Sequence, residues 1–334
     1  MFDEKRILVT GGTGSFGNAF IDMTLDRYNP EEIIIFSRDE MKQWNMAMRW
    51  QDDPRVRFVI GDVRDANALK RVFEDVDYVV HAAATKIVPT AEYNPLECVK
   101  TNVDGAKNVI DAALDAGVKG VVALSTDKAS NPINLYGATK LVSDKLFVAA
   151  NRIRSHNRTR FSVVRYGNVM GSRGSVIPFF LKLKDLGVSE LPITDTRMTR
   201  FMITLDDAVK LVWHAFEDMV GGEIYVKKIP SMNIIDIAKA IAPEASHKII
   251  GVREGEKIHE QMIGAEDAEH TYEYDEHYKI LPAIHGMSTD PERIKDGRRV
   301  DVGFIYDSSS NSEWMPVAEL RSWIDANHKK IGQI

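Results

Sequence analysis

Two side chains one helical turn apart have the chemistry needed to move a proton from a hydroxyl group. Tyr136 and Lys140 are four positions apart, so a helix presents both on one face. A positive charge beside a phenol lowers its pKa from the usual value near ~10 and helps it to accept a proton. Thr126 is expected to hydrogen-bond the same hydroxyl. The spacing alone is weak evidence, because exposed helices often carry such a pair.

The same segment holds an acid and a base in adjacent positions, Asp127 and Lys128. Such a pair suits an elimination, in which a base removes a proton from carbon while an acid protonates the departing hydroxyl. This use requires a neutral amine and a protonated carboxyl, each against its usual state at neutral pH. An ordinary surface ion pair is the alternative. Beside the tyrosine, the pair favours dehydration of a sugar over simple alcohol oxidation.

A glycine-rich turn at the start of the chain predicts a nucleotide-binding site. The apolar residues 6–10 read as a strand that enters the turn, a helical segment follows, and a second apolar strand is expected at 32–36. Glycines permit the tight turn and the close approach of pyrophosphate, and a helix N-terminus offers free N–H groups. The predicted cofactor contacts in this turn are Gly11, Thr13, Gly14, Ser15, Phe16 and Gly17.

The end of the second strand favours NADP over NAD. NAD-binding proteins usually place an acidic residue there, whereas this chain has Ser37 followed by Arg38, with Lys42 one turn further on. A hydroxyl and two cations suit a 2′-phosphate, although the nearby Asp39 weakens the argument. The other predicted cofactor contacts are Asp62, Val63, Ala82, Tyr136, Lys140 and Val169.

The alternation of strand and helix patterns predicts an α/β fold with a doubly wound parallel sheet, the NAD(P)-binding Rossmann type. Residues 1–165 are predicted to form the NADP-binding domain, to which about 205–228 return. Residues 166–334 are predicted to form a smaller, discontinuous α/β substrate-binding lobe, with a mobile loop at 308–312. The expected strands are 56–60, 78–81, 121–124, 161–164 and 223–226, and the expected helices are 69–73, 96–116, 136–151, 205–220 and 317–327.

Composition excludes several classes of protein. The 334 residues contain one cysteine, Cys98, so no disulfide framework exists within the chain. A net charge of −6 without a basic stripe argues against nucleic acid. No apolar window or signal pattern indicates a membrane partner, so a cytoplasmic enzyme is expected. His259-Glu260 is followed at position 263 by isoleucine, so no metal site is predicted.

These motifs together resemble the extended short-chain dehydrogenases/reductases and, within them, the branch of inverting UDP-N-acetylglucosamine 4,6-dehydratases that serves pseudaminic acid biosynthesis. The glycine turn belongs to the whole superfamily, whereas the run from 125 to 140 is typical of the dehydratase branch. Relatives tend to have proline where this chain has Glu254. The matching segments are 10–17, 36–42, 81–89, 92–97, 124–140, 164–180, 192–201, 253–260 and 311–314.

The resemblance implies C4 oxidation with Tyr136 as base, Lys128 as the base at C5 and Asp127 as the acid. It also implies UDP-N-acetylglucosamine as substrate, and a homo-oligomer, either a dimer or a hexamer. A diphosphate needs cations, for which Lys86, Arg200 and Arg253 are the candidates, and the resemblance adds Asn168 and Glu256. Asn102 is expected to steady the surroundings of the active-site lysine. A retaining dehydratase, a nucleotide-sugar epimerase and a silent NADP-binding protein stay as alternatives.

Overall fold

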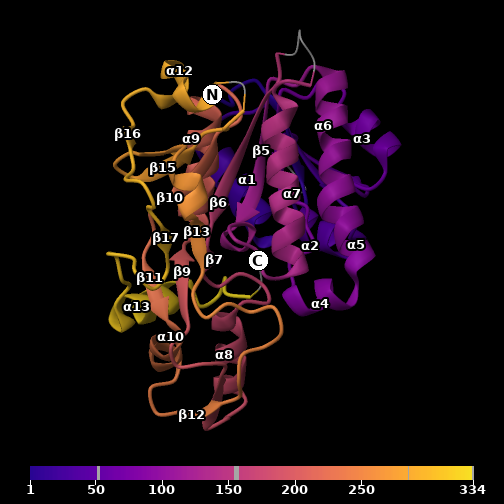
Figure 1. Cartoon of the computed structure of the whole chain (residues 1–334). Helices are drawn as coiled ribbons and strands as arrows, with labels where there is room; N and C mark the ends of the chain where they lie inside the picture. The colour runs from indigo at the N-terminus through magenta and orange to yellow at the C-terminus, as the bar shows by residue number, and fades with distance from the viewer. Residues whose placement is uncertain (51–52, 154–157, 285, 333–334) are drawn as a thin grey trace.

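One large twisted sheet organises the computed structural model, which describes residues 1–50, 53–153, 158–284 and 286–332 (Figure 1). Its strand order is β16-β14-β15-β10-β6-β5-β4-β1-β2-β3. All neighbours from β10 to β3 pair in parallel, which confirms the predicted doubly wound sheet. The parallel strands are β1 (Arg6–Thr10), β2 (Glu32–Ser37), β3 (Val56–Ile60), β4 (Tyr78–His81), β5 (Gly120–Thr126), β6 (Arg160–Tyr166) and β10 (Ile224–Lys227).

Helices cover both faces of the sheet, as buried parallel strands require. On one face α1 (Ser15–Arg27) packs against α9 (Leu205–Asp218), and Trp213 Nε1 donates to Thr24 Oγ1 at 3.3 Å. On the other face α3 (Ala66–Val72), α6 (Gly105–Ala116) and α7 (Leu135–Ala150) lie side by side (Figure 1). Shorter helical elements at strand ends are α2 (Glu40–Trp50), α4 (Val88–Tyr93) and the 3₁₀ turn η2 (Asp127–Ala129).

The helix expected over 96–116 is interrupted by a wider turn. Helix α5 (Pro95–Val99) passes into a π-helical turn η1 (Lys100–Asp104), and α6 follows at once. Such π turns often occur at functional sites, because they displace side chains from the regular helical positions. Here the displaced turn carries the buried Asn102.

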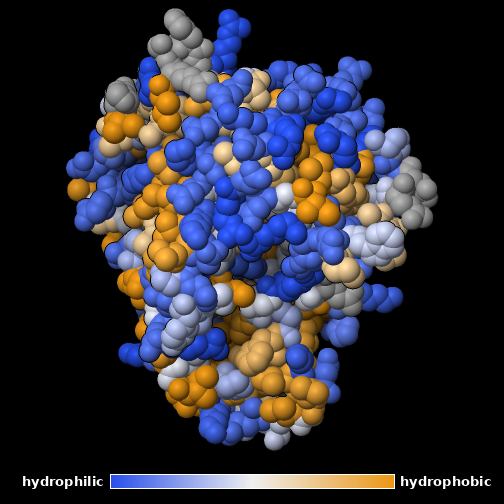
Figure 2. All heavy atoms as spheres, turned by 90° about the vertical axis from the view of Figure 1, so that its right-hand side faces the viewer, coloured by the Kyte–Doolittle hydropathy of each residue, from blue (hydrophilic) through white to orange (hydrophobic). Residues whose placement is uncertain are grey.

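A second, smaller core forms the lower part of the molecule in Figure 1. It lies between α8 (Val176–Asp185), α10 (Ile234–Ile241) and α13 (Val317–Asn327). Figure 2 shows a mainly hydrophilic surface above and a largely hydrophobic one at the lower end, where Phe179, Leu186 and Ile249 are exposed. The strands of this part are β7 (Asn168–Val169), β9 (Thr199–Ile203), β11 (Ser231–Asn233), β8 (Glu190–Ile193) and β12 (Ser246–Ile249).

The C-terminal third contributes to both cores. Strands β14 (Thr271–Glu273), β15 (His277–Ile280) and β16 (Arg298–Arg299) extend the large sheet in antiparallel fashion. Helix α9 and strand β10 also pack with this sheet. The sequence analysis assigned residues 166–334 to the smaller lobe and did not foresee that β14, β15 and β16 would join the large sheet. The remaining short elements are α11 (Ala265–Ala268), η3 (Met287–Thr289) and α12 (Pro291–Ile294).

The loop predicted at 308–312 is a turn held by hydrogen bonds. Strand β13 (Gln261–Ile263) pairs with β17 (Tyr306–Asp307), and Ser308, directly after β17, is fully buried. Asp307 accepts the backbone N–H groups of Ser309 and Ser310. Asn311 Nδ2 donates to the Ile229 carbonyl at 2.9 Å. Serine and asparagine therefore build a hydrogen-bonded turn here, as short polar side chains commonly do.

Helix α7 and the turn η2 make a close contact that only glycine permits. The Asn134 side chain caps α7 by accepting the Gly137 N–H at 2.7 Å. A Cβ at Gly137 would overlap the carbonyl oxygen of Lys128 and would lie 3.1 Å from Pro132 Cβ. The absence of a side chain at 137 thus sets the distance between α7 and the turn that follows β5.

Replacing Gly137 with alanine is expected to destabilise the protein, although alanine favours a helix by about 1 kcal/mol over glycine. The added methyl group forces α7 away from η2, and overpacking of this kind costs about 1–3 kcal/mol. The midpoint of urea unfolding measures the change. Ala138→Gly, at the neighbouring half-buried position, is the control that loses helix propensity alone. A Gly137→Ala protein more stable than the wild type would contradict the tight contact.

Candidate active site

The glycine-rich turn between β1 and α1 forms a backbone cradle. Gly11 has φ +67°, and a Cβ there would lie 2.7 Å from the backbone nitrogen of Ala83. A Cβ at Gly17 would overlap the backbone of Gly12. Helix α1 begins after Gly14 without a side-chain cap, so its first N–H groups remain available to an anion. The cradle therefore fits the pyrophosphate of a dinucleotide.

The end of β2 presents cations next to acids. Arg38 is 61% exposed and lies 3.7 Å from Asp62, while Lys42 pairs with Asp39 at 2.9 Å. The Ser37 hydroxyl accepts from Thr13 Oγ1 at 3.1 Å and from Gln43 Nε2 at 3.3 Å. Gln43, which the sequence analysis missed, also donates to the carbonyls of Ser37 and Val59 and so fixes the ends of β2 and β3.

The acid–base pair predicted from the sequence sits at the carboxyl end of β5 and has a third member. Lys128 Nζ lies 3.0 Å from Asp127 Oδ1 and 3.1 Å from Glu260 Oε1. Thr126 Oγ1 donates to the same Asp127 oxygen at 2.9 Å. Asp127 and Glu260 are both buried, and Lys128 is 22% exposed. Glu260 had been considered only as part of a zinc motif, because its distance in sequence hides its place beside Lys128.

Burial shifts the pKa of the acid in the expected direction, whereas the pKa of the base moves the other way. Burial raises the pKa of Asp127, and the charge of Glu260 adds to the increase while Lys128 opposes it. Burial alone would lower the pKa of Lys128, but Asp127 and Glu260 outweigh it and raise this pKa above its usual value. In the ligand-free chain Lys128 is therefore an ammonium, which corrects the expectation of a neutral amine.

The phenol of Tyr136 is also held in its neutral form. Burial raises the pKa of Tyr136 to about 12, although the Lys128 charge and a hydrogen bond with Thr126 act against burial. Lys140 lies one turn away on α7, where burial lowers its pKa and Asp144 opposes that decrease. The decrease predicted for the pKa of the phenol is thus absent in the ligand-free chain, because burial raises this pKa more than the nearby Lys128 charge lowers it.

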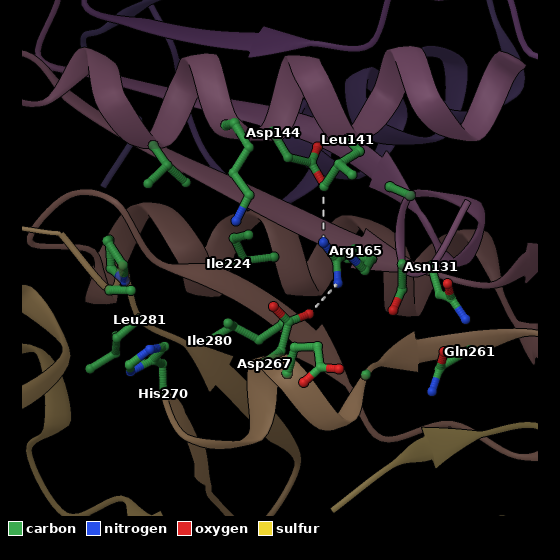
Figure 3. Close-up of a pocket in the computed structure, with 18 of the residues that line it drawn as sticks. Asn131, Leu141, Asp144, Arg165, Ile224, Gln261, Asp267, His270, Ile280 and Leu281 are labelled. Carbon is green, nitrogen blue, oxygen red and sulfur yellow. Dashed lines mark hydrogen bonds and ion pairs between the residues drawn. The ribbon is translucent and has the colours of Figure 1, made fainter. Parts of the chain in front are cut away.

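A buried ion pair connects α7 to the central sheet. Asp144 Oδ2 accepts from Ser125 Oγ at 2.8 Å and from Arg165 Nη2 at 3.3 Å. Arg165 Nη1 donates to the Met262 carbonyl at 2.7 Å and lies 3.7 Å from Asp267. Figure 3 shows Arg165 between Asp144 and Asp267 on the wall of a cavity of about 500 Å³. Arg165 therefore joins β6, α7 and β13.

Asn102 joins the π turn to the strand ends around the site. Its side chain accepts the Thr85 N–H at 2.8 Å and donates to the Thr85 carbonyl at 3.0 Å. It also donates to Thr139 Oγ1 at 3.0 Å, directly before Lys140. Asn102 thus fixes the position of α7 beside the loop that leads to Lys86. The contact explains the π turn, since a regular helix would point residue 102 elsewhere.

Four of the five predicted substrate residues lie in loops or at the start of a short strand. Lys86 Nζ donates to the Arg173 carbonyl at 3.3 Å, and Asn168 begins β7. Arg253 is 53% exposed and lies 3.9 Å from Glu256, whose Oε2 is buried without a hydrogen-bond partner in the described part of the chain. The turn from 253 to 256 is anchored on α7, because Asn134 Nδ2 donates to the Gly255 carbonyl at 2.7 Å.

Arg200 lies in the buried surroundings of Lys128, and its contact with a diphosphate stays a prediction. Its side chain is buried, and its guanidinium donates to the carbonyls of Thr199 and Ile258. Its Nε lies 3.9 Å from Glu260 Oε1. Arg200 therefore compensates the charge of Glu260 and belongs to the cluster around Lys128.

The described residues contain no group of three or more His, Cys, Asp or Glu side chains arranged to hold a metal ion. Within the same residues, no helix combines the length and the apolar character needed to cross a bilayer.

Curated relatives of the chain act on nucleotide sugars according to their names. A UDP-N-acetylglucosamine 4,6-dehydratase (inverting) from Campylobacter jejuni subsp. jejuni serotype O:2 is 57% identical over 325 residues, which are 96% of this chain and 97% of that protein. A UDP-glucose 4-epimerase from Rickettsia canadensis is 45% identical over 287 residues, 84% of each chain.

Solved structures share the fold over most of the chain. The structure of Pen from Bacillus thuringiensis has a TM-score of 0.90 at 34% identity and covers 98% of this chain and 99% of its own. A dTDP-glucose 4,6-dehydratase from Streptomyces venezuelae with NAD and TYD bound has a TM-score of 0.68 at 26% identity, covering 76% of this chain and 86% of its own.

The family model described as "Polysaccharide biosynthesis protein" matches residues 7–282, which include the cradle, Tyr136, Lys140 and the whole cluster around Lys128. The chain therefore belongs to this polysaccharide biosynthesis family and has the fold of the extended short-chain dehydrogenases/reductases.

Proposed function

We propose that this protein is an inverting UDP-N-acetylglucosamine 4,6-dehydratase. The observation that carries the proposal is the buried Asp127–Lys128 pair beside Thr126 and Tyr136, because an elimination needs an acid and a base in addition to the oxidising groups. The Campylobacter relative of that name, 57% identical over 96% of this chain, supports it. A place in pseudaminic acid biosynthesis, a cytoplasmic location and a homo-oligomer, dimer or hexamer, are parts of the same proposal.

The cofactor in this proposal is NADP, held by the glycine cradle and by Arg38 and Lys42. Both cations lie where β2 ends, the place at which a ribose 2′-phosphate would meet them. When bound, the nicotinamide would supply a hydride acceptor for oxidation at C4 and a hydride donor for reduction at C6, so the sugar would undergo no net oxidation. Asp39 and Asp62 already pair with the two cations, and the phosphate would compete with these carboxylates.

Tyr136 receives the proton of the C4 hydroxyl in the first step. The phenol needs help to ionise, because its pKa of about 12 leaves it neutral at physiological pH. Thr126, a hydrogen-bond partner of Tyr136, and Lys140 on the next turn favour the phenolate. The resulting C4 ketone acidifies the hydrogen on C5 and makes elimination possible.

Lys128 then removes the C5 proton, and Asp127 protonates the departing C6 hydroxyl. Both roles follow from moving one proton across the 3.0 Å contact, from the ammonium to the carboxylate. This transfer creates a neutral amine and a carboxylic acid without changing the number of protons in the site. The raised pKa of Asp127, to which the charge of Glu260 contributes, favours the transfer. The same charge also raises the pKa of Lys128, and this second effect opposes the transfer.

The substrate lies between the two cores in this proposal. Lys86 and the exposed Arg253 are suited to the diphosphate, with Asn168 and Glu256 beside the nucleotide sugar. Arg200 is proposed to act on the charge cluster, since its guanidinium already binds two carbonyls of the chain.

A 4-epimerase is the second candidate, because epimerases 45% identical to this chain cover 84% of it. An epimerase would use Tyr136 and Lys140 in the same way but has no step for an acid–base pair at Asp127 and Lys128. The two reactions differ in mass, since dehydration removes one water from the sugar and epimerisation removes nothing.

The product formed from UDP-N-acetylglucosamine in D₂O tests the proposal. We expect NMR to show a 4-keto-6-deoxy sugar with deuterium at C5 in the L-arabino configuration, without net accumulation of NADPH. Retained configuration at C5 would indicate a retaining dehydratase, and an unchanged mass would indicate an epimerase. Release of NADP from the denatured protein, identified by mass spectrometry, checks the cofactor, and NAD in its place would refute that part.

Tyr136→Phe is expected to lower turnover by roughly 10²–10⁴-fold, because a positioned proton acceptor contributes that much. The ring volume stays nearly unchanged, so the unfolding midpoint should change little. Tyr225→Phe is the matched control, since Tyr225 is a buried tyrosine of the same sheet whose hydroxyl binds Asp218. Steady-state kinetics decides, and a loss below about tenfold would assign the first proton transfer to another group.

Lys128→Met should permit C4 oxidation and block elimination, because it keeps the side-chain length but has no amine. Reduced cofactor is then expected to accumulate with a 4-keto sugar, and exchange of the C5 hydrogen with solvent should fall. Lys119→Met, which removes a lysine paired with Asp77, serves as the control. Normal turnover and exchange in Lys128→Met would mean that Lys128 is only an ion-pair partner.

A further inference from the structure

Glu260 is a buried carboxylate that faces the reacting pair from a distant part of the chain. Its Oε1 lies 3.1 Å from Lys128 Nζ, and its backbone directly precedes β13. Its Oε2 and the Oδ2 of Asp127 are both buried and have no hydrogen-bond partner among the described residues. An unsatisfied buried carboxylate oxygen is costly, so two of them around one ammonium indicate a site arranged for function.

The backbone of Glu260 is held on both sides. Its N–H donates to Ser308 Oγ at 2.9 Å, and its carbonyl accepts the Ser308 N–H at 2.8 Å. The Ser308 hydroxyl lies 2.7 Å from Thr199 Oγ1, and Arg165 donates to the carbonyl of Met262, two residues further along the strand. Such support fixes the carboxylate relative to Lys128, as a positioned charge requires.

We propose that Glu260 is a positioning residue that anchors the Lys128 ammonium and sets how the proton is shared between Lys128 and Asp127. The inference rests on the proposed function, in which that proton must move to Asp127 before elimination. A fixed negative charge beside Lys128 holds the proton on the amine in the free enzyme. The charge of Arg200, 3.9 Å away, limits this effect.

The sign of the pH effect follows from the charges around the cluster. Lys128 is surrounded by Asp127 and Glu260, with Arg200 and Lys257 as the nearby cations and Tyr136 as the facing phenol. The charge of Glu260 raises the pKa of both Lys128 and Asp127. Removing that charge must therefore lower both values and shift the pH profile of the elimination toward acid.

Glu260→Gln removes the charge and keeps the shape, and Glu260→Asp keeps the charge but withdraws it by one methylene. Glu223→Gln is the matched control, because Glu223 is equally buried, accepts backbone N–H groups and lies 3.8 Å from Arg293 away from the site. Retained cofactor and the unfolding midpoint show that each variant is folded. If Glu260→Gln does not fold, Glu260→Asp must show the same changes at smaller size.

Two measurements test the inference. The first is the pH profile of kcat/KM, which we expect to move by about one unit or more toward acid in Glu260→Gln, with kcat falling more than KM changes. The second is acetylation of Lys128 by acetic anhydride at fixed pH, followed by peptide mass spectrometry. Only the neutral amine reacts, so a decrease of one pKa unit gives about tenfold faster labelling, while the exposed Lys107 should label at an unchanged rate.

The labelling separates this inference from the proposed function, since it needs no substrate. Faster labelling of Lys128 in folded Glu260→Gln, with Glu223→Gln like the wild type, supports the role of Glu260 even if the wild type yields no dehydrated product. Unchanged labelling of Lys128 overturns the inference even if the wild type is an active dehydratase. An equal shift in Glu223→Gln would also overturn it.

Discussion

The ion pairs of the Lys128 ammonium with two carboxylates connect distant segments of the chain. This charge is mostly withdrawn from water and needs partners of opposite sign, which Asp127 and Glu260 supply at 3.0 Å and 3.1 Å. One partner follows β5 and the other precedes β13, so the cluster connects the parallel sheet to the C-terminal third. Since removing one partner leaves a buried charge unpaired, the positions of both segments depend on each other.

The packing around α7 fixes the position of the helix that carries Tyr136 and Lys140. Gly137 lets the helix approach the carbonyl of Lys128, and the Asn134 cap both starts the helix and holds Gly255. Further along the helix, Asp144 and Arg165 bind each other in a fully buried pair. Tyr136 and Lys140 therefore project from a helix that is fixed at both ends of its active face, as proton transfer from a defined hydroxyl would require.

The same scaffold is compatible with two reactions found among the relatives. The dehydratase relative is 57% identical to this chain, and the epimerase relative is 45% identical to it. In the proposed mechanism, the tyrosine, the lysine and the cofactor cradle serve the reversible oxidation at C4. Elimination needs a proton acceptor and donor in addition, and the cluster of Lys128, Asp127 and Glu260 offers both within one buried network.

The sequence by itself determined what local pattern controls: the parallel strands, the glycine turn, α7, and the proximity of Thr126 to Lys128 along the chain. Strand periodicity and glycine spacing reflect local backbone preferences, so they can be read directly. Only the tertiary structure decided the protonation of Lys128 and Tyr136 and the presence of Glu260 beside Lys128. It also decided the burial of the Arg200 side chain and the hydrogen bonds of Ser308. These features depend on burial and on charges from segments more than a hundred residues apart, and pKa values respond to such neighbours in space whatever their distance in sequence.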